Sequence, residues 1–334
     1  MLKDTSRTSA YRDFIYDHKH LFANKLVLDV GCGTGILSLF SAKAGARRVI
    51  AVDNSAIISK AREIVATNGL DNTVSCVRGK IEDVELPLPQ SSDKVDILVS
   101  EWMGYCLLYE AMLDSVLHAR DRYLNPSTGL MVPSHCALRI APVADPDYLA
   151  DTLGFWPDVY GFDMSPMTDK FFDDVLVRTV GPEHVAGNSA VFKSLPLHTI
   201  SKEDLTFSSP FVVVLDKDVE ALDGWVIWFD TFFLPDRTAV VPDSARAETW
   251  GHGKGEPGVA FSTGPNAKET HWQAGLLLID RGRKRAHELK KGQKIEGSIA
   301  YSKRRENSRE LVIEMTWQAV GIAAEKGKQV WTMR

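Results

Sequence analysis

The feature that most constrains the fold is the segment Leu28–Ser38, which reads LDVGCGTGILS. A short apolar run leads into three glycines, Gly31, Gly33 and Gly35, and a helical stretch follows them. Glycines let the backbone turn sharply and approach a ligand, and free N–H groups at a helix N-terminus can bind its polar groups. We therefore expect a strand that turns into a helix beside a nucleotide-type cofactor.

The glycine turn alone does not decide between a dinucleotide and S-adenosylmethionine. Its glycines follow the spacing GxGxG rather than GxGxxG, and an acidic residue, Asp29, precedes the first of them. Both details favour S-adenosylmethionine. The sequence there lacks the GxxxxGK[ST] pattern of a phosphate-binding loop, which argues against a nucleoside triphosphate.

Short apolar runs alternate with helical stretches from about residue 24 to residue 130. This alternation is typical of a parallel, doubly wound sheet that helices cover on both faces. The expected strands are Lys25–Val30, Val49–Asp53, Thr73–Arg78 and Val95–Ser100. The expected helices are Gly35–Lys43, Ala56–Asn68 and Leu113–Arg122. We assign residues 1–132 to this α/β domain.

The pattern changes near Pro133, beyond which short segments alternate apolar with polar residues. Such alternation favours antiparallel sheet, as in a sandwich or barrel. The expected strands are Cys136–Ala141, Phe211–Leu215, Gly224–Phe233, Gly275–Asp280, Glu296–Tyr301 and Glu310–Trp317. We therefore assign residues 133–334 to a second, all-β domain.

Two segments of the second domain lack this alternation. Ala144–Val175 is rich in aromatic residues. It is either a loop packed on its own domain or an arm that buries those residues against a partner. Pro235–Gly258 is rich in glycine and proline, so we expect a flexible surface insertion.

At the junction of the domains, the Val132–Pro133 bond is either cis or the commoner trans.

Composition argues against several kinds of partner. The formal net charge is −5 and no Lys/Arg stripe is present, which argues against nucleic acid. No apolar run approaches the roughly 18 residues of a membrane span. The cysteines, Cys32, Cys76, Cys106 and Cys136, are scattered, so neither a zinc site nor a disulfide framework is indicated. We expect a reduced protein of the cytoplasm, with the nucleus as an additional location.

Two acidic residues follow expected strands at positions that suit adenosine. Asp53 closes the second strand, where a carboxylate accepts hydrogen bonds from ribose hydroxyls. Glu82 follows the third strand and is placed to accept from the adenine amino group. Each also has a simpler interpretation, because Asp53 could cap the next helix and Glu82 could be a solvated surface charge.

A pair of carboxylates marks the end of the fourth strand. Glu101 ends the strand, and Glu110 follows nine positions later, after a glycine-containing stretch that could fold back. Two carboxylates suit a planar guanidinium, and they offset the repulsion between a cationic substrate and a sulfonium methyl donor. The alternative is that both glutamates are ordinary exposed charges.

These features resemble the protein arginine methyltransferase family, and the resemblance covers nearly the whole chain. Ser100–Glu110 is similar to the family's double-glutamate loop, the glycine turn to its cofactor loop, and Thr270–Trp272 to its THW loop. Further segments look like type I members: Met1–Asp4, Arg7–Tyr16, Ala42–Ala46, Val159–Ser165 and Phe261–Pro265. The resemblance implies a Rossmann-like methyltransferase domain, then an antiparallel β-barrel domain with a helical dimerisation arm at about residues 144–175.

The resemblance also implies roles for single residues. Glu101 and Glu110 would hold the substrate guanidinium, and Arg7 would pair with the carboxylate of the cofactor's methionine part. His271 would hydrogen-bond Asp4 and form part of a proton exit route. The implied cofactor-binding residues are Arg7, Asp29, Gly31, Gly33, Gly35, Asp53 and Glu82. The implied substrate-pocket residues are Met1, Met103, Tyr105, Met112 and Trp272, whose methionines would influence whether dimethylation is asymmetric.

The implied activity is methyl transfer from S-adenosylmethionine to arginines in Arg/Gly-rich protein segments, by a homodimer that needs no metal. The family carries a cofactor-covering helix before the point where this sequence begins, so we expect a fragment or a misassigned start. Two other readings remain open. One is a catalytically impaired, cofactor-binding dimerisation module, and the other is a methyltransferase of a small cationic metabolite.

Overall fold

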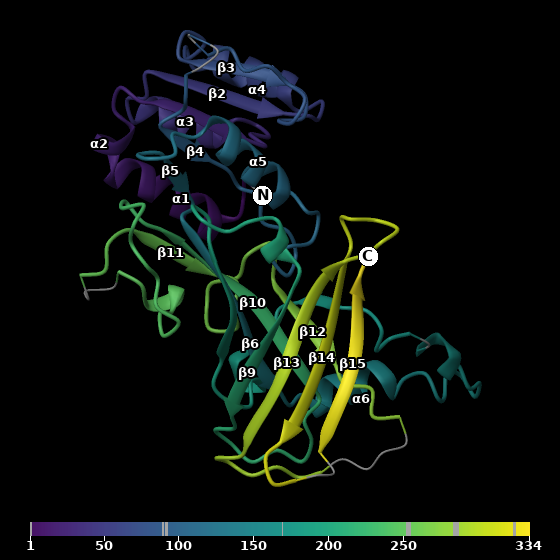
Figure 1. Cartoon of the computed structure of the whole chain (residues 1–334). Helices are drawn as coiled ribbons and strands as arrows, with labels where there is room; N and C mark the ends of the chain where they lie inside the picture. Colours follow the sequence, from purple (N-terminus) through teal and green to yellow (C-terminus); the bar gives the residue numbers. More distant parts are fainter. Residues whose placement is uncertain are drawn as a thin grey trace.

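The computed structural model describes residues 2–88, 90, 93–168, 170–251, 255–282, 287–322 and 325–334. It contains two differently built parts (Figure 1). The purple and blue N-terminal part holds a parallel sheet with helices around it, and the teal to yellow part holds long antiparallel strands. The predicted combination of an α/β part and an all-β part is confirmed.

The N-terminal part is a five-stranded parallel sheet in the order β3-β2-β1-β4-β5. Its strands are β1 (Leu26–Val30), β2 (Arg48–Asp53), β3 (Val74–Arg78), β4 (Ile97–Val99) and β5 (Leu130–Val132). Its helices are α1 (Thr5–Asp17), α2 (Lys19–Phe22), α3 (Ile36–Lys43), α4 (Ile58–Thr67) and α5 (Leu113–Tyr123). Every residue of β1 and β4 is buried, which accounts for their unbroken apolar runs.

The strands and helices predicted for this part overlap β1 to β4 and α3 to α5. Helix α1 lies outside the predicted elements. Its side chains Tyr11, Phe14 and Ile15 are fully buried. The rings of Tyr11 and Phe14 contact Phe233, which belongs to the second part of the chain. Helix α1 therefore joins the two parts, and its packing fixes where its first turn lies.

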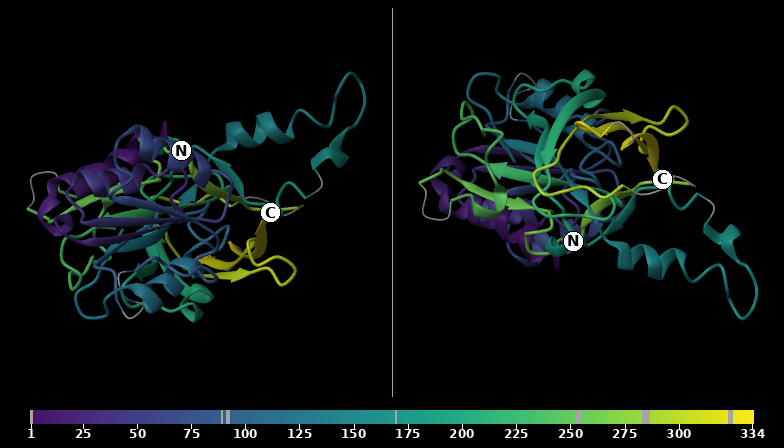
Figure 2. Two further views of the ribbon diagram at one scale, coloured as in Figure 1. Left: turned by 90° about the horizontal axis from the view of Figure 1, so that it is seen from above. Right: turned by 90° about the horizontal axis from the view of Figure 1, so that it is seen from below.

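The C-terminal part contains two antiparallel sheets. The larger has the order β7-β12-β10-β6-β8 with β11 paired to β10, and the smaller has the order β15-β14-β13-β9. The larger sheet comprises β6 (His135–Val143), β7 (Leu176–Arg178), β8 (Ala190–Pro196), β10 (Gly224–Phe233), β11 (Val259–Ser262) and β12 (Ala274–Leu278). The smaller comprises β9 (Phe207–Val214), β13 (Lys294–Lys303), β14 (Leu311–Ala319) and β15 (Lys326–Met333). A teal segment between β6 and β7 leaves this body (Figure 2).

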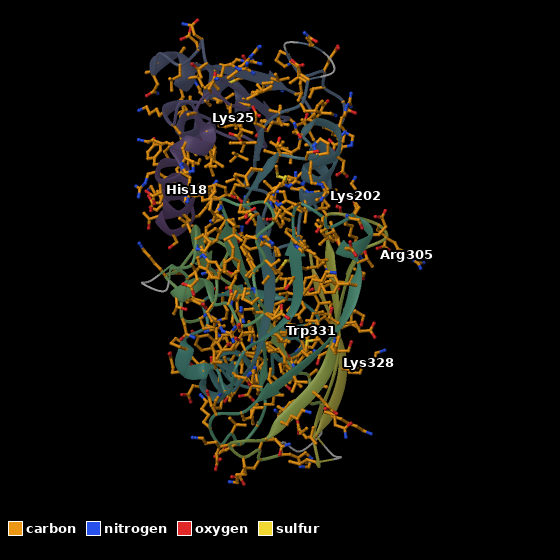
Figure 3. The ribbon with its side chains drawn as sticks, turned by 60° about the vertical axis from the view of Figure 1, so that its left-hand side comes forward. His18, Lys25, Lys202, Arg305, Lys328 and Trp331 are labelled. Atoms are coloured by element: carbon orange, nitrogen blue, oxygen red, sulfur yellow. The ribbon has the colours of Figure 1, made fainter. Side chains whose placement is uncertain are left out.

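The two antiparallel sheets are joined along both sides, which makes the predicted barrel. Isolated β-bridges link Asp174 to Thr332 on one side and Gly187 to Leu215 on the other. Strand β15 alternates, so that Trp331 is fully buried whereas Lys328 is exposed (Figure 3). The indole N–H of Trp331 donates to a carbonyl of β12 at 2.9 Å and so ties the small sheet to the large one.

The aromatic segment 144–175 is an arm rather than a loop packed on its own barrel. Its helix α6 (Pro146–Leu153) has no buried residue, and a 3-10 turn, Ser165–Thr168, follows it. Phe171 and Phe172 pack on the outer face of the large sheet and anchor the base of the arm. Large apolar side chains are exposed along the rest: Phe155, Tyr160, Phe162, Met164 and Met167. None of the helices in the described ranges is long and apolar enough to cross a membrane.

The described residues of Pro235–Gly258 make specific contacts with the barrel, and the flexibility of this segment stays a prediction. The buried guanidinium of Arg139 donates to the carbonyl oxygens of Asp243 and Ala245, and it also forms an ion pair of 2.6 Å with Asp230. Trp250 packs edge-on against Phe232. A glycine- and proline-rich composition does not reveal such anchors, because the donor lies about a hundred residues upstream in the sequence.

The junction between the two parts is built from buried backbone and two histidines. Strand β5 ends at Val132, the Val132–Pro133 bond is cis, and β6 begins at His135. The backbone N–H of Met131 donates to Nε2 of His198 at 3.0 Å. Burial, together with neighbouring positive groups, lowers the pKa of His198 from 6.5 to about 4. Burial also lowers the pKa of His135 to about 4.

We expect acid to destabilise the protein through this junction. Between pH 6.5 and 4 the unfolded chain binds a proton at His198 that the folded chain does not, so the free energy of unfolding falls as the pH falls. His198→Gln should remove about 1–2 kcal/mol of this pH dependence, after allowance for partial solvent screening. Denaturant titrations at several pH values would measure it. His20→Gln, at an exposed position of α2, is the control, and an unchanged slope in the His198 variant would contradict this role of His198.

Candidate functional site

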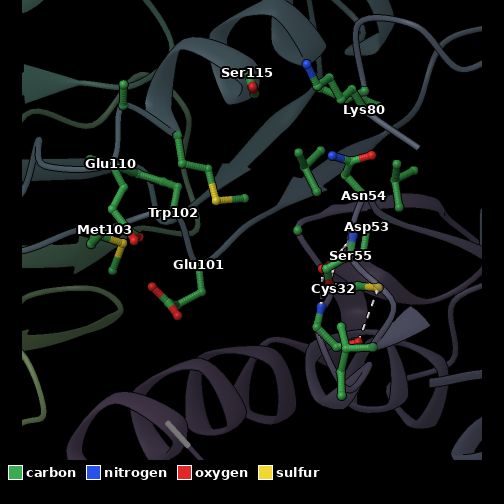
Figure 4. A pocket seen from close by; sticks show the side chains of 18 of the residues that line it. Cys32, Asp53, Asn54, Ser55, Lys80, Glu101, Trp102, Met103, Glu110 and Ser115 are labelled. Carbon is green, nitrogen blue, oxygen red and sulfur yellow. Dashed lines mark hydrogen bonds between the residues drawn. The ribbon is translucent and has the colours of Figure 1, made fainter. Parts of the chain in front are cut away.

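A cavity of about 1030 Å³ lies outside the carboxyl ends of the parallel strands. Its walls come from the ends of β1, β2 and β4, the first turn of α5, and the turn between β13 and β14. Ligands of open α/β sheets bind at this edge. Figure 4 shows Glu101, Met103 and Glu110 at one end of the cavity and Cys32 and Asp53 at the other.

The glycine turn after β1 forms one wall of the cavity. Gly31 has φ +72°, a conformation that favours glycine, and a Cβ there would also displace the end of the Met112 side chain, whose Cε would lie 2.0 Å away. The N–H of Gly33 donates to Oδ2 of Asp53 at 2.9 Å. Gly35, at φ +84°, is the N-cap of α3. Gly31 and Gly33 line the cavity and Gly35 does not.

Asp29 lies beneath this turn and does not line the cavity. The hydroxyl of Ser38 donates to its Oδ2 at 2.6 Å, and burial raises the pKa of the carboxyl to about 7. The predicted direct contact of Asp29 and of Gly35 with the cofactor is therefore not supported. Both residues lie behind the turn and shape it, a role that a sequence pattern does not separate from direct contact.

Asp53 and Glu82 both line the cavity. The carboxylate of Asp53 accepts from the N–H and hydroxyl of Ser55 at 2.8 and 2.6 Å, so it caps the following turn as well as facing the cavity. Glu82 accepts from the hydroxyl of Ser115 at 2.6 Å. Burial opposes its ionisation, but this hydrogen bond and others outweigh burial and lower its pKa. The carboxylate of Glu82 is thus fixed by a hydrogen bond and is not a freely solvated surface charge.

Glu101 is buried at the end of β4 and faces Arg7 of α1. The atoms Oε2 of Glu101 and Nη2 of Arg7 are 2.9 Å apart, and both side chains are almost fully buried. Burial raises the pKa of Glu101, and the charge of Arg7 opposes that rise. Nε of Arg7 is buried without a hydrogen-bond partner among the described residues. Arg7 therefore holds Glu101 and also lines the cavity.

Glu110 lies in a folded-back loop that its sequence specifies only in part. A Cβ on Gly104 would lie 1.9 Å from the carbonyl oxygen of Tyr109, so the fold-back requires glycine there. Glu110 itself has φ +74°, a left-handed conformation that is strained for glutamate. Its side chain is 53% exposed, and its Oε1 lies 3.1 Å from Nη2 of Arg309. Because the loop between them folds back, Glu101 and Glu110 line the same cavity, as their spacing in the sequence predicts.

Asp4 connects α1 to the barrel. Its Oδ1 accepts from the N–H of Arg7 at 3.0 Å and caps the helix. Its Oδ2 accepts from the backbone N–H of His271 at 2.9 Å and lies 2.7 Å from the ring atom Nδ1. Burial opposes ionisation of Asp4, but these hydrogen bonds outweigh it and lower the pKa. The hydrogen bond between His271 and Asp4 that the resemblance implied is present.

The predicted substrate-pocket residues divide into two groups. Met103 and Met112 line the cavity. Trp272 does not, but its indole N–H donates to the carbonyl oxygen of Met103 at 2.8 Å and so supports the wall from behind. Tyr105 lies outside the wall and packs against Tyr109. The predicted direct role of Trp272 and Tyr105 is therefore not supported, and Met1 lies outside the described residues.

Sequence reasoning missed two residues that hold the site together. The hydroxyl of Tyr11 donates to the carbonyl oxygen of Ser100 at 2.8 Å, which places the end of β4. Arg309 contacts Glu110 from a polar turn of the barrel. The segment containing Tyr11 carries part of the family resemblance, but nothing local in the sequence connects Arg309 with a residue about 200 positions away.

Comparison with known proteins gives matches over almost the whole chain. Residues 27–127 match a methyltransferase domain, and residues 134–321 match the arginine methyltransferase oligomerization subdomain. The chain is similar to the ribosomal protein arginine N-methyltransferase rmt3 of Schizosaccharomyces pombe, with 44% identity over 97% of this chain and 56% of that protein. It is 43% identical to protein arginine N-methyltransferase 1 of the same yeast, over 95% of this chain and 85% of that one.

A solved structure described as "Trypanosoma brucei PRMT1 enzyme-prozyme heterotetrameric complex with AdoHcy" has a similar fold, with a TM-score of 0.84 and 34% identity. The superposition covers 100% of this chain and 96% of that one. The match to the oligomerization subdomain spans more than half of the chain. The two yeast relatives align with almost all of this chain and therefore with both of its parts. The chain belongs to the protein arginine methyltransferase family.

Proposed function

We propose that this chain transfers a methyl group from S-adenosylmethionine to a terminal guanidino nitrogen of arginine in proteins, giving mono- and asymmetric dimethylarginine. One observation carries the proposal: Glu101 and Glu110 meet at one end of a cavity whose other end is lined by Asp53 and the glycine turn. The curated relatives named above are protein arginine N-methyltransferases, which supports the same activity.

The cavity residues fit S-adenosylmethionine. Gly31, with φ +72°, brings backbone without a side chain to the wall of the cavity. The carboxylates of Asp53 and Glu82 suit ribose hydroxyls and the adenine amino group. The guanidinium of Arg7, a residue that lines the cavity, suits the carboxylate of the methionine part. The bound cofactor supplies an electrophilic methyl group, and the related trypanosome structure contains AdoHcy, the demethylated form of the same molecule.

The two glutamates would bind and activate the substrate. A guanidinium is a poor nucleophile because its positive charge is delocalised over three nitrogens. Carboxylates at Glu101 and Glu110 orient this fork and offset the repulsion between two cationic reactants. Glu101 serves best when ionised, and Arg7 opposes the effect of burial on its pKa.

His271 and Asp4 remain a proposed proton exit route. His271 does not line the cavity, but its ring atom Nδ1 lies 2.7 Å from Oδ2 of Asp4. Asp4 holds the imidazole in one orientation. We propose that the pair accepts the proton that the methylated guanidinium releases, by way of Glu101. Met103 and Met112 at the cavity wall would restrict the bound product and favour asymmetric dimethylation.

The chain is expected to act as a homodimer through its arm. The oligomerization subdomain supports an oligomer, and the exposed aromatic side chains of the arm need a surface to cover them. Arg/Gly-rich protein segments are the proposed substrates, for which the net charge of −5 is permissive. A cytoplasmic and nuclear location stays a prediction. The comparisons do not favour a small cationic metabolite as the substrate or a catalytically impaired module.

Replacement of either glutamate should abolish most of the activity without loss of cofactor binding. Glu110→Gln keeps the size of the side chain but removes the charge, so kcat/KM for an Arg/Gly-rich peptide should fall about 100-fold. Labelled methyl transfer measures the rate, and calorimetry with S-adenosylhomocysteine measures cofactor binding. Glu63→Gln, an exposed change on α4, is the matched control. Full activity in the Glu110 variant would rule out the two-carboxylate mechanism.

Polar substitutions in the arm should weaken the oligomer. Tyr160 and Phe162 are 98% and 71% exposed, so Tyr160→Ser with Phe162→Ser should leave the folded protomer intact. We expect sedimentation velocity to show that the wild type is a dimer. The dimer of the double variant should dissociate at a protein concentration at least tenfold higher than that for the wild type. Val240→Ser, at an equally exposed site on the insertion, is the control. A monomeric wild type, or a double variant of unchanged mass, would contradict the role of the arm.

A further inference from the structure

Arg309 contacts both the backbone and the side chain of Glu110. It lies in the turn between β13 and β14, on the barrel side of the cavity, and it lines that cavity. Its main-chain carbonyl oxygen accepts the N–H of Glu110 at 2.9 Å. Its guanidinium donates from Nη2 to Oε1 of Glu110 at 3.1 Å. One barrel residue thus holds the backbone and the carboxylate of the same glutamate.

Glu110 needs such support. Its left-handed φ of +74° is followed by a φ of +57° at Ala111, so two neighbouring residues occupy a conformation that surrounding contacts must maintain. The side chain of Glu110 is half-exposed and would otherwise sample several rotamers. In contrast, Glu101 is buried and already held by Arg7. The two carboxylates that share one substrate are therefore fixed by different means.

The turn that carries Arg309 is itself anchored. Lys303, at the end of β13, forms an ion pair of 2.5 Å with Asp114 in the first turn of α5. The N–H of Arg309 donates to Oδ1 of Asn307 at 3.2 Å. Arg309 therefore approaches Glu110 from a frame that does not depend on its own side chain. A change of the side chain alone should leave the main-chain bond to Glu110 in place.

We propose that Arg309 is a positioning residue for Glu110. Its guanidinium engages Oε1 and leaves Oε2 for the substrate, because a carboxylate offers about four lone-pair sites. The inference rests on the proposed function and adds a residue of the barrel to the reaction. Arginine suits this task better than lysine, because its planar guanidinium presents its donors in a fixed geometry, whereas the ammonium group of lysine is a point charge on a flexible stem.

A double-mutant cycle tests this role. Arg309→Gln should lower kcat for an Arg/Gly-rich peptide about tenfold, with KM and cofactor affinity within about twofold. The same change in a Glu110→Gln background should cost less than about twofold, because the charged carboxylate that Arg309 positions is already gone. Arg309→Lys should recover part of the lost rate. Mass spectrometry of the peptide measures turnover, and calorimetry measures cofactor binding.

Arg304→Gln is the matched control. Arg304 is in the same turn, but it pairs with Glu306 and Glu310 and is not among the described residues that line the cavity. Its removal changes the net charge near the substrate equally, so it should leave kcat unchanged. A loss in the Arg304 variant equal to that in the Arg309 variant would indicate a general charge effect and overturn the proposal.

Two further outcomes would overturn the role of Arg309. Equal losses in the wild-type and Glu110→Gln backgrounds would show a role independent of Glu110. A lower KM in Arg309→Gln would show that Arg309 competes with the substrate for the carboxylate. A folded wild type that binds S-adenosylmethionine but methylates no arginine peptide would instead refute the proposed function, and the assigned role of Arg309 with it.

Discussion

The geometry of the site depends on the carboxylate of Asp4. One of its oxygens caps α1 at Arg7, and the other accepts two hydrogen bonds from His271 of the barrel. Because the helix begins at a fixed point, Arg7 reaches the buried carboxylate of Glu101. Helix α1 also packs on Phe233, so apolar burial and charge-assisted hydrogen bonds hold the two parts in one arrangement. The cavity between them is thereby pre-organised.

Much of the fold follows from the sequence pattern. The unbroken apolar strands predict a covered parallel sheet, and the alternation beyond Pro133 predicts antiparallel strands, with both ends of β10 in agreement. Two strands are not apparent from the sequence: Leu176–Arg178 is too short to show a pattern, and Lys326–Met333 begins with four residues that are not apolar, although its side chains alternate in burial. The contacts of the insertion Pro235–Gly258 cannot be predicted from its composition. Arg139 binds its backbone carbonyl oxygens, and every residue type has such an oxygen.

The sequence predicts those site residues in which a carboxylate follows a parallel strand, as Asp53 and Glu101 do. A strand end fixes which edge of the sheet a side chain occupies. Asp29 shows that a pattern cannot separate contact with a ligand from support beneath it, since its carboxylate is buried under the turn. Arg309 could not be predicted, because its partner Glu110 is brought to it only by packing of the barrel against the parallel sheet.

The most direct test of the account is a crystal structure of the protein with S-adenosylhomocysteine and an Arg/Gly-rich peptide. We expect the peptide guanidinium to lie within hydrogen-bonding distance of both Glu101 and Glu110, with Arg7 against the methionine carboxylate. Arg309 should still contact Glu110. A peptide arginine bound outside this end of the cavity, or one that contacts neither glutamate, would contradict the account.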